Sequence, residues 1–471
     1  MWSTGDAEEE EGECAICLES LGSGVQILEC GHRFHKACVD ELIKRDVQQA
    51  CPLCRVQLPA TAEKMYDDAL SIIVRLERSV GQPSVNAPWG PLNRQQKRDF
   101  KGAKCMLEKA AEEGVAKAGY LVGQIYMLGW GVDVNYKKAF EWYEKAAAQG
   151  HATAQSNMGV LYDKGQGVDK NNKKAKEWWE KAAEQGLSDA QFNLAEMYRV
   201  GNGVDVNYKK AFELYEKAAE QGVAEAQYNL GMMYMYNGKG VDVNYKKAMA
   251  WHLKAAEQNF FESQTMVANF LMEGKGGVRR DRKKALVWYA RAVEGGCKFA
   301  MYAFGKEYDE GIPGLLRADP KKASQLWAKA AEMGLADAQV ALSNNYRNGR
   351  GVPQSDAKAV KWVRKAAEQG HPLGAHNLSL LYAQGRGVPK SDTESFRWTK
   401  VAAEAGHPPA MCNCGVYFCN GTGGARQDYL EALRWIRKSE GLGYPKAAAA
   451  AAHVESCIEW EREHRGQSAL G

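Results

Sequence analysis

The chain has 471 residues, which is long enough for several domains or for one extended repeat array. Its formal net charge is +4, and residues 1–60 carry 11 acidic and 5 basic side chains, so the remainder carries 57 basic and 47 acidic ones. A positive excess this small over so long a segment is not typical of a nucleic-acid-binding protein. The sequence contains no run of 18 apolar residues, so no membrane span is expected.

The N-terminal residues 1–13, "MWSTGDAEEEEGE", have neither the positive start nor the apolar core of a secretory signal. We expect them to form an acidic, disordered tail. Of the twelve cysteines, six lie between residues 14 and 54. Clustered cysteines in a chain without an export signal favour metal binding over disulfides, so we expect a cytoplasmic or nuclear location.

The clustered cysteines, together with two histidines, follow a regular spacing of C-x2-C, C-x-H-x2-H-x2-C and C-x2-C, with twelve residues in each gap. Eight sulfur and nitrogen donors match two tetrahedral zinc sites, because structural zinc takes four such ligands. We expect Phe34, Val39 and Ile43 to supply the small apolar core. The eight expected ligands are Cys14, Cys17, Cys30, His32, His35, Cys38, Cys51 and Cys54.

This ligand series resembles the RING finger of the subclass with two central histidines, which we place at residues 14–58. The resemblance implies interleaved sites and zinc that is structural, since four protein ligands leave no position for water. It implies a ubiquitin ligase that docks a ubiquitin-charged conjugating enzyme and forms no covalent intermediate. The implied zinc sites are Cys14, Cys17, His35 and Cys38 for the first ion, and Cys30, His32, Cys51 and Cys54 for the second.

The docking positions that the RING resemblance implies are Ile16, Pro52 and Leu53, and Arg55 stands where the family often places a cation that positions ubiquitin. An arginine suits that role because its guanidinium keeps its charge and offers several fixed donors. The family commonly has tryptophan where this chain has Leu42, which implies a smaller docking contact. A non-catalytic zinc-binding scaffold for complex assembly is therefore the alternative function.

Residues 62–80 repeat apolar side chains every three or four positions, which predicts one amphipathic helix. We favour packing of its apolar stripe within the chain, and dimerisation through residues 62–80 is an alternative. The segment "GQPSVNAPWGP" at 81–91 interrupts the helix, so residues 59–98 are expected to be a helix and a Pro/Gly linker.

Variants of "KAAEQG" recur from residue 109 to residue 443 at intervals of 36 to 38 residues. This period predicts a solenoid of stacked helix pairs. A GxGV link is expected to end each first helix with a left-handed glycine. Each second helix is expected to begin after an N-cap residue: Asn135, Asn171, Asn207, Asn244, Asp281, Asp319, Ser355, Ser391 and Asp428.

An apolar, mostly tryptophan position recurs in every second helix, and we interpret it as inter-repeat core. Its members are Trp142, Trp178, Leu214, Trp251, Trp288, Leu326, Trp362, Trp398 and Trp435. Two links, "GKGGV" and "GIPGLL", depart from the pattern.

The repeat pattern resembles the Sel-1-like repeats, a relative of the tetratricopeptide repeats. The resemblance implies an α-solenoid, placed at 99–460, that binds a substrate or adaptor protein, with a C-terminal tail at 461–471. The whole is thus expected to be mainly α: a small zinc-stabilised RING finger followed by the solenoid.

The six cysteines outside the cluster are interpreted as small buried residues without a site of their own. Cys412, Cys414 and Cys419 lie in "MCNCGVYFC", where positions two apart point to different sides of a helix. Cys105, Cys297 and Cys457 are interpreted in the same way.

Overall fold

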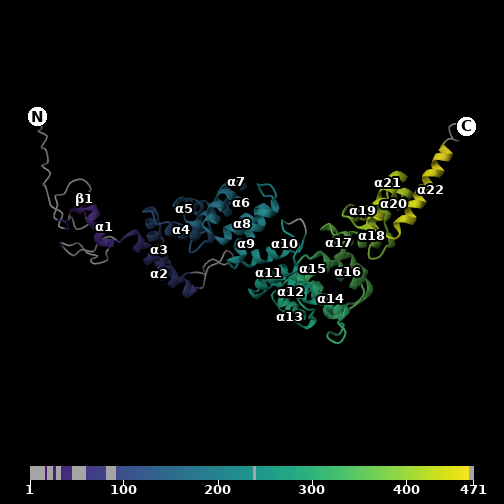
Figure 1. Cartoon of the computed structure of the whole chain (residues 1–471), viewed down its shortest axis with the longest axis horizontal. Coiled ribbons are helices and arrows are strands. Elements are labelled where there is room, and N and C mark those ends of the chain that lie inside the picture. The colour runs from purple at the N-terminus through teal and green to yellow at the C-terminus, as the bar shows by residue number, and fades with distance from the viewer. Residues whose placement is uncertain are drawn as a thin grey trace. The chain divides into compact units, whose positions relative to one another are not determined.

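The computed structural model describes residues 16–17, 25–27, 33–44, 53, 60–80, 92–236 and 240–465. These residues are almost wholly helical, apart from one two-stranded sheet near the N-terminus and one isolated bridge. The chain separates into two compact units, unit 1 (Met1–Gln221) and unit 2 (Gly222–Gly471). The mainly α fold predicted from the sequence is confirmed (Figure 1).

Unit 1 begins with a hairpin, β1 (Val25–Ile27) paired antiparallel to β2 (Arg33–His35), and a short helix, α1 (Lys36–Lys44). Three helix pairs with the repeat period then follow a first pair, and each helix packs on the next in the chain. The bounds are α2 (Ala62–Val80), α3 (Arg94–Glu112), α4 (Ala116–Leu128), α5 (Tyr136–Ala148), α6 (Ala152–Lys164), α7 (Asn172–Glu184), α8 (Ser188–Val200) and α9 (Tyr208–Glu220).

Unit 2 continues the same arrangement with six helix pairs and one terminal helix. The bounds are α10 (Ala224–Met233), α11 (Tyr245–Glu257), α12 (Phe261–Glu273), α13 (Arg282–Glu294), α14 (Lys298–Glu310), α15 (Pro320–Glu332), α16 (Ala336–Asn348), α17 (Asp356–Glu368), α18 (Pro372–Gln384), α19 (Asp392–Glu404), α20 (Pro408–Asn420), α21 (Tyr429–Gly441) and α22 (Ala447–Arg465). Helix α22 extends past residue 460, where we expected the solenoid to end.

All nine N-caps predicted for the second helices are confirmed. In each case the side-chain oxygen accepts a hydrogen bond from the backbone N–H three residues later, as Asn135 does from Lys138 and Asp281 does from Lys284. Each bond satisfies a helix-terminal donor that would otherwise lack a partner.

The links between the two helices of a pair also follow the prediction in most repeats. Gly165 and Gly349, for example, end α6 and α16 in the left-handed conformation. The second link glycine lies close to the preceding repeat: a Cβ on Gly351 would stand 2.1 Å from the carbonyl oxygen of Pro320. Only glycine combines a positive φ with so close a backbone approach.

The irregular links change the local geometry. "GKGGV" keeps a left-handed Gly274, whereas Gly311 of "GIPGLL" has φ 75° and ψ 166°, and an Ile312–Leu316 bridge closes that loop. Helix α10 also departs from the pattern, because it ends at Met233 without a left-handed glycine. That third departure was not predicted from the sequence.

The prediction that the tryptophan stripe forms the inter-repeat core is wrong by one position. Every member except Trp398 is only half-buried, and Leu326, Trp362 and Trp435 pack against the edge of a core cluster. The residue that follows each of them is buried instead, as Trp179 follows Trp178 and Tyr215 follows Leu214. A helix turns by about 100° per residue, so a side chain one residue before the buried position points to the edge of the core.

The buried aromatic rings fill spaces that small residues leave on the first helices. A Cβ on Gly159 would stand 2.4 Å from the Trp179 indole nitrogen, and one on Gly123 would stand 2.4 Å from the Tyr143 ring. The small residues therefore let the two helices of a pair approach closely.

The amphipathic helix predicted at 62–80 is α2, with the bounds expected. Its apolar stripe is buried at Ala69, Ile73 and Leu76, and α2 packs against α3 within the same chain. This contact accounts for the stripe, and dimerisation through it is not shown.

Candidate functional site

The hairpin and α1 bring together three of the expected metal ligands. His35 ends β2, Cys38 follows in the first turn of α1, and Cys17 lies in the turn at 16–17. The donor atoms of these three side chains all lie within 4.8 Å of one another, and the Cys17 Sγ to His35 Nδ1 distance is 3.3 Å. Two thiols and an imidazole at such distances suit a zinc ion.

The local fold explains why His35 points toward Cys17. Successive side chains of a strand point to opposite faces, so Phe34 turns away from His35 and is fully buried. Val39, one residue after Cys38, is also buried. Both expected core residues are thus confirmed, while the side chain of Ile43 is not described.

Several predicted site residues lie outside the described part of the chain. Of the expected docking residues, Ile16 is half-buried beside Cys17, and the Leu53 side chain is 56% exposed. Leu42 belongs to α1, but its side chain is not described. The predicted site residues that lie outside the described part of the chain are Cys14, Cys30, His32, Cys51, Cys54, Pro52 and Arg55.

Comparison with family models identifies both parts of the chain. The Sel1 repeat model matches nine consecutive segments, each one helix pair, between residues 116 and 444. The chain belongs to the Sel1 repeat family. The Ring finger domain model matches residues 12–55, so the Sel1 repeats follow a RING finger, as the sequence indicated.

Different known proteins resemble the Sel1 repeats and the RING finger of this chain. The Sel1 repeat protein from Oxalobacter formigenes has a solved structure that is 27% identical, covers 73% of this chain and 90% of its own, and superposes with a TM-score of 0.50. E3 ubiquitin-protein ligase MPSR1 of Arabidopsis thaliana is 35% identical over 77 residues, which is 15% of this chain and 37% of that protein.

E3 ubiquitin-protein ligase ZNRF4 of Mus musculus is 36% identical over 59 residues, which is 12% of this chain and 18% of that protein. The chain thus spans well under half the length of these two ligases, and the likeness is confined to the RING region. The RING finger implies zinc binding, and the Sel1 repeats indicate protein binding. No helix in the described part of the chain has the length and apolar composition needed to cross a bilayer.

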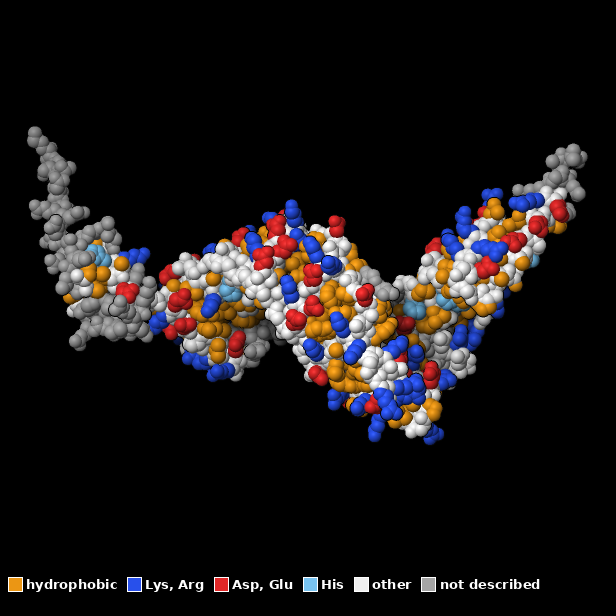
Figure 2. Space-filling view, viewed as in Figure 1, with side chains coloured by type: hydrophobic (Ala, Val, Ile, Leu, Met, Phe, Trp, Pro, Cys, Tyr) orange, Lys and Arg blue, Asp and Glu red, His pale blue; other side chains and the backbone are white. Residues whose placement is uncertain are grey.

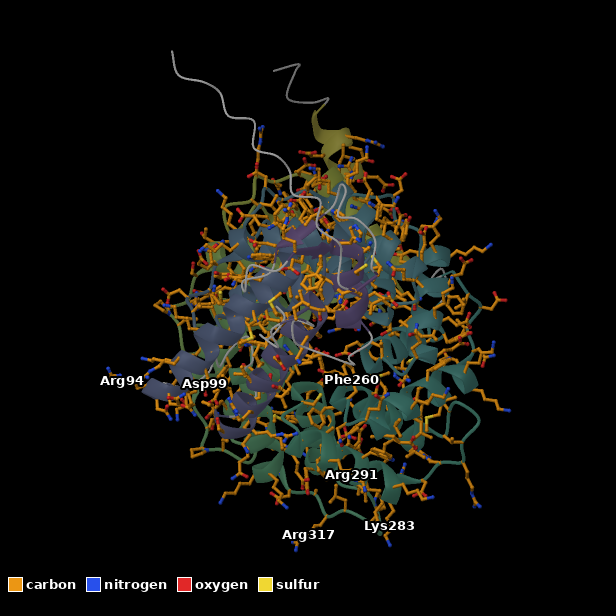
Figure 3. The ribbon with its side chains drawn as sticks, turned by 90° about the vertical axis from the view of Figure 1, so that its left-hand side faces the viewer. Arg94, Asp99, Phe260, Lys283, Arg291 and Arg317 are labelled. Carbon is orange, nitrogen blue, oxygen red and sulfur yellow. The ribbon has the colours of Figure 1, made fainter. Side chains whose placement is uncertain are left out.

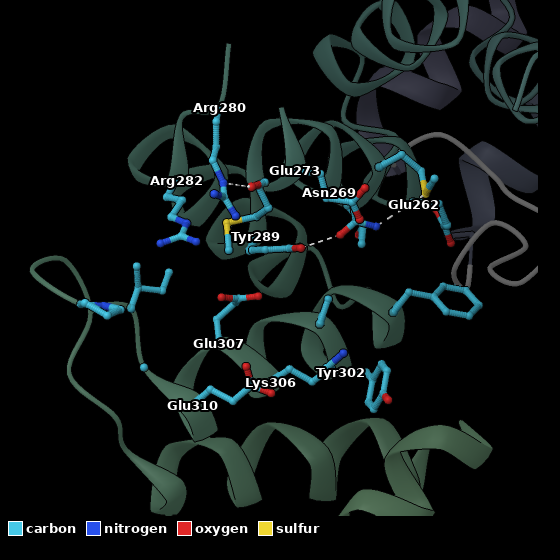
Figure 4. Close-up of a pocket in the computed structure, with 18 of the residues that line it drawn as sticks. Glu262, Asn269, Glu273, Arg280, Arg282, Tyr289, Tyr302, Lys306, Glu307 and Glu310 are labelled. Carbon is cyan, nitrogen blue, oxygen red and sulfur yellow. Dashed lines mark hydrogen bonds between the residues drawn. The ribbon is translucent and has the colours of Figure 1, made fainter. Parts of the chain in front are cut away.

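Within the Sel1 repeats, a cavity of about 640 Å³ opens between α12, α13 and α14 of unit 2 (Figure 4). Tyr228, Phe299 and Tyr302 supply aromatic walls. The floor is ordered by a hydrogen bond from the Tyr289 hydroxyl to the Asn269 side-chain oxygen, 2.5 Å long. The irregular link "GIPGLL" lines this cavity through Gly311, Ile312 and Pro313, so that departure from the repeat pattern helps to form it.

The cavity has charges of both signs. Arg282 and Glu307 face each other across it (Figure 4). The Arg282 Nε is buried and finds no hydrogen-bond acceptor among the described residues. Burial, followed by repulsion from Glu310, raises the pKa of Glu307. Desolvated polar groups at the edge of an aromatic cavity are suited to bind a polar segment of another molecule.

The cavity was not predictable from the sequence because its residues come from four helices, α10, α12, α13 and α14, in three successive repeats. The one available signal was local composition: seven basic residues and one acidic residue lie between Lys275 and Arg291. Figure 2 shows Lys and Arg side chains gathered on the part of unit 2 that α13 and α14 form.

The remaining cysteines are only partly as predicted. Cys297, Cys412, Cys414 and Cys419 are buried, and burial raises the pKa of Cys414 to about 12, which keeps that thiol protonated. Cys105 is exposed instead, and Cys457 is half-buried, so for these two the interpretation as buried residues is wrong.

Proposed function

We propose that this protein is a RING-type E3 ubiquitin ligase whose Sel1 repeats hold the substrate or an adaptor. The observation that carries the proposal is the Ring finger match at 12–55, together with the Cys17, His35 and Cys38 cluster inside it. The two ligases that resemble the chain in this region support it.

The proposed zinc ions are structural and number two. Cys17, His35 and Cys38 would join Cys14 around the first, and the short distances among the three described donors support that grouping. Cys30, His32, Cys51 and Cys54 would bind the second. With four protein ligands each, neither ion keeps a position for water, so zinc maintains the shape of the finger and takes no part in bond making.

The conjugating enzyme that docks on the RING finger then carries out the ubiquitin transfer. The substrate lysine amine attacks the thioester carbonyl, an amide bond forms, and the conjugating enzyme's cysteine leaves as a thiolate. The apolar side chains of Ile16 and Leu53, with Pro52 and Leu42, would contact that enzyme, and Arg55 would hold ubiquitin in place. The exposure of Leu53 supports this role, since a large apolar side chain in water is available to a partner.

Replacing Leu53 or Ile16 by alanine is expected to lower the rate of ubiquitin transfer about 10-fold, because a contact worth about 1.4 kcal/mol at an interface is lost. Zinc content should stay unchanged. The matched control is Leu430→Ala, which removes another exposed leucine (69%) from α21. Transfer rates that do not differ among the three variants would refute the docking role.

For the substrate, we place recognition at the α12–α14 cavity. The buried Arg282 Nε, which has no hydrogen-bond acceptor among the described residues, would donate to a carboxylate or carbonyl oxygen of a bound peptide. The aromatic walls would contact the peptide's side chains. A carboxylate group of the peptide fits the side of the cavity where Arg280 and Arg282 lie. The lining also contains four glutamates, Glu262, Glu273, Glu307 and Glu310.

The cavity is tested with a random peptide library displayed on phage and selected against the full chain. Selected peptides should contain acidic residues, and their Kd should rise at least about 10-fold with Arg282→Ala, as expected for one charged hydrogen bond. Arg317→Ala is the control, since Arg317 is exposed, projects outward and lies outside the cavity (Figure 3). If Arg282→Ala leaves the Kd of every selected peptide unchanged, the cavity is not the recognition site.

A further inference from the structure

A second group of metal-binding side chains lies at the end of the solenoid, far in sequence from the RING finger. Cys419 is near the end of α20, while His453 and Cys457 are four residues apart on α22. Side chains at i and i+4 of a helix lie one above the other on the same face. Helix α22 packs against α20 and α21, so this face of α22 meets the end of α20.

The three donor atoms converge. All lie within 4.8 Å of one another, and the Cys457 Sγ to His453 Nε2 distance is 3.9 Å. In a tetrahedral zinc site, bond lengths of about 2.3 Å to sulfur and 2.0 Å to nitrogen put neighbouring donors about 3.5 to 3.8 Å apart. Small side-chain adjustments would therefore close the cluster around one ion.

We propose that Cys419, His453 and Cys457 bind a Zn²⁺ ion in addition to those of the RING finger. Two thiolates and an imidazole are soft donors that select zinc over calcium or magnesium. The fourth position is open to Glu461, one further turn along the same face of α22, or to water. The electrostatic neighbours of Tyr429 include Cys419, Cys457 and Glu461, so this carboxylate lies on the side of the cluster.

The proposed site lies where the terminal helix α22 meets the last repeat, and a metal ion there would stabilise that contact. The nine Sel1 repeat matches end at residue 444, and α22 covers the apolar end of the last repeat through Ala447, Ala451 and Val454. A repeat array needs such a cap at its end. A metal ion shared between α20 and α22 would fasten the cap to the repeat that it covers.

The burial of the three side chains suits this arrangement. Cys419 is 5% exposed, Cys457 is half-buried and His453 is exposed, so the site lies at the surface and a metal ion can reach it. The surface position also means that His453 can be replaced without disturbing the core.

The test counts zinc per chain by mass spectrometry in full-length protein purified under reducing conditions. His453→Ala and Cys457→Ser are each expected to carry one zinc fewer than the unaltered chain. The control Cys105→Ser, which removes an exposed thiol from α3, should lose none. Cobalt substitution provides a second readout: the thiolate–cobalt absorption should decrease in the first two variants and not in the control.

Equal zinc content in all four proteins would overturn the proposal. A disulfide between Cys419 and Cys457 in protein purified without reductant, with no change in zinc content between the variants, would do the same. Neither result bears on the ubiquitin ligase proposal, because the RING ligands are unaltered in every variant.

Discussion

Replacing Cys17 or His35 is expected to unfold the RING finger and abolish ubiquitin transfer, while the Sel1 repeats stay folded. A segment of some forty residues buries too little apolar surface to be stable alone. Structural zinc in such fingers contributes about 10–16 kcal/mol of folding free energy, which is comparable to the whole stability of a typical domain. Losing one of four ligands therefore removes the main stabilising term.

This outcome is measured on Cys17→Ser and His35→Ala in the full chain. Ubiquitin transfer should fall to background, and the zinc content should decrease. The helical circular dichroism of the solenoid should remain, because its stability comes from packing between repeats. Cys105→Ser is again the matched control, and it should retain full activity. Full transfer activity in Cys17→Ser would contradict a zinc-dependent RING finger.

Trp179→Ala is expected to destabilise the α6–α7 region by about 3–5 kcal/mol, the range for removal of a buried aromatic side chain. The indole of Trp179 is 5% exposed, and its N–H donates a hydrogen bond to the Ser156 carbonyl at 3.1 Å. The ring also fills the space beside Gly159, so its removal leaves a cavity between two helices.

The neighbouring Trp178 provides the control, because it is the same residue type on the same helix. It is half-buried, and Lys181 lies over its ring at 4.3 Å from the centroid. Trp178→Ala should cost only about 1 kcal/mol. Hydrogen exchange of the α6 and α7 amides measures both losses locally, which suits a repeat array that opens in parts. Equal losses, or a larger loss for Trp178→Ala, would contradict the assignment of the core position.

Features that depend on one repeat were predictable from the sequence. The N-caps, the left-handed glycines and α2 follow from local backbone chemistry, and the 36-residue period gave many copies to align. There is a physical reason why the sequence predicted burial of Trp178 and the structure buries Trp179 instead. Both positions carry apolar residues in several repeats, and the choice between them depends on where the neighbouring helix crosses.

Sites formed between distant segments were not predictable in the same way. Cys17, His35 and Cys38 were expected to come together because their spacing is that of a known zinc finger. Cys419 and Cys457 are 38 residues apart and follow no such spacing, and the pairing of His453 with Cys457 at i and i+4 was overlooked. The α12–α14 cavity likewise depends on how three successive repeats pack.

The central claim is tested most directly by an autoubiquitination assay. Purified, zinc-loaded full-length protein is incubated with ubiquitin, activating enzyme, ATP and a panel of conjugating enzymes. The proposed ligase should form ubiquitin conjugates with at least one conjugating enzyme, and Cys17→Ser should form none. No conjugates with any conjugating enzyme, from protein whose zinc content is intact, would contradict the ligase and favour a non-catalytic scaffold.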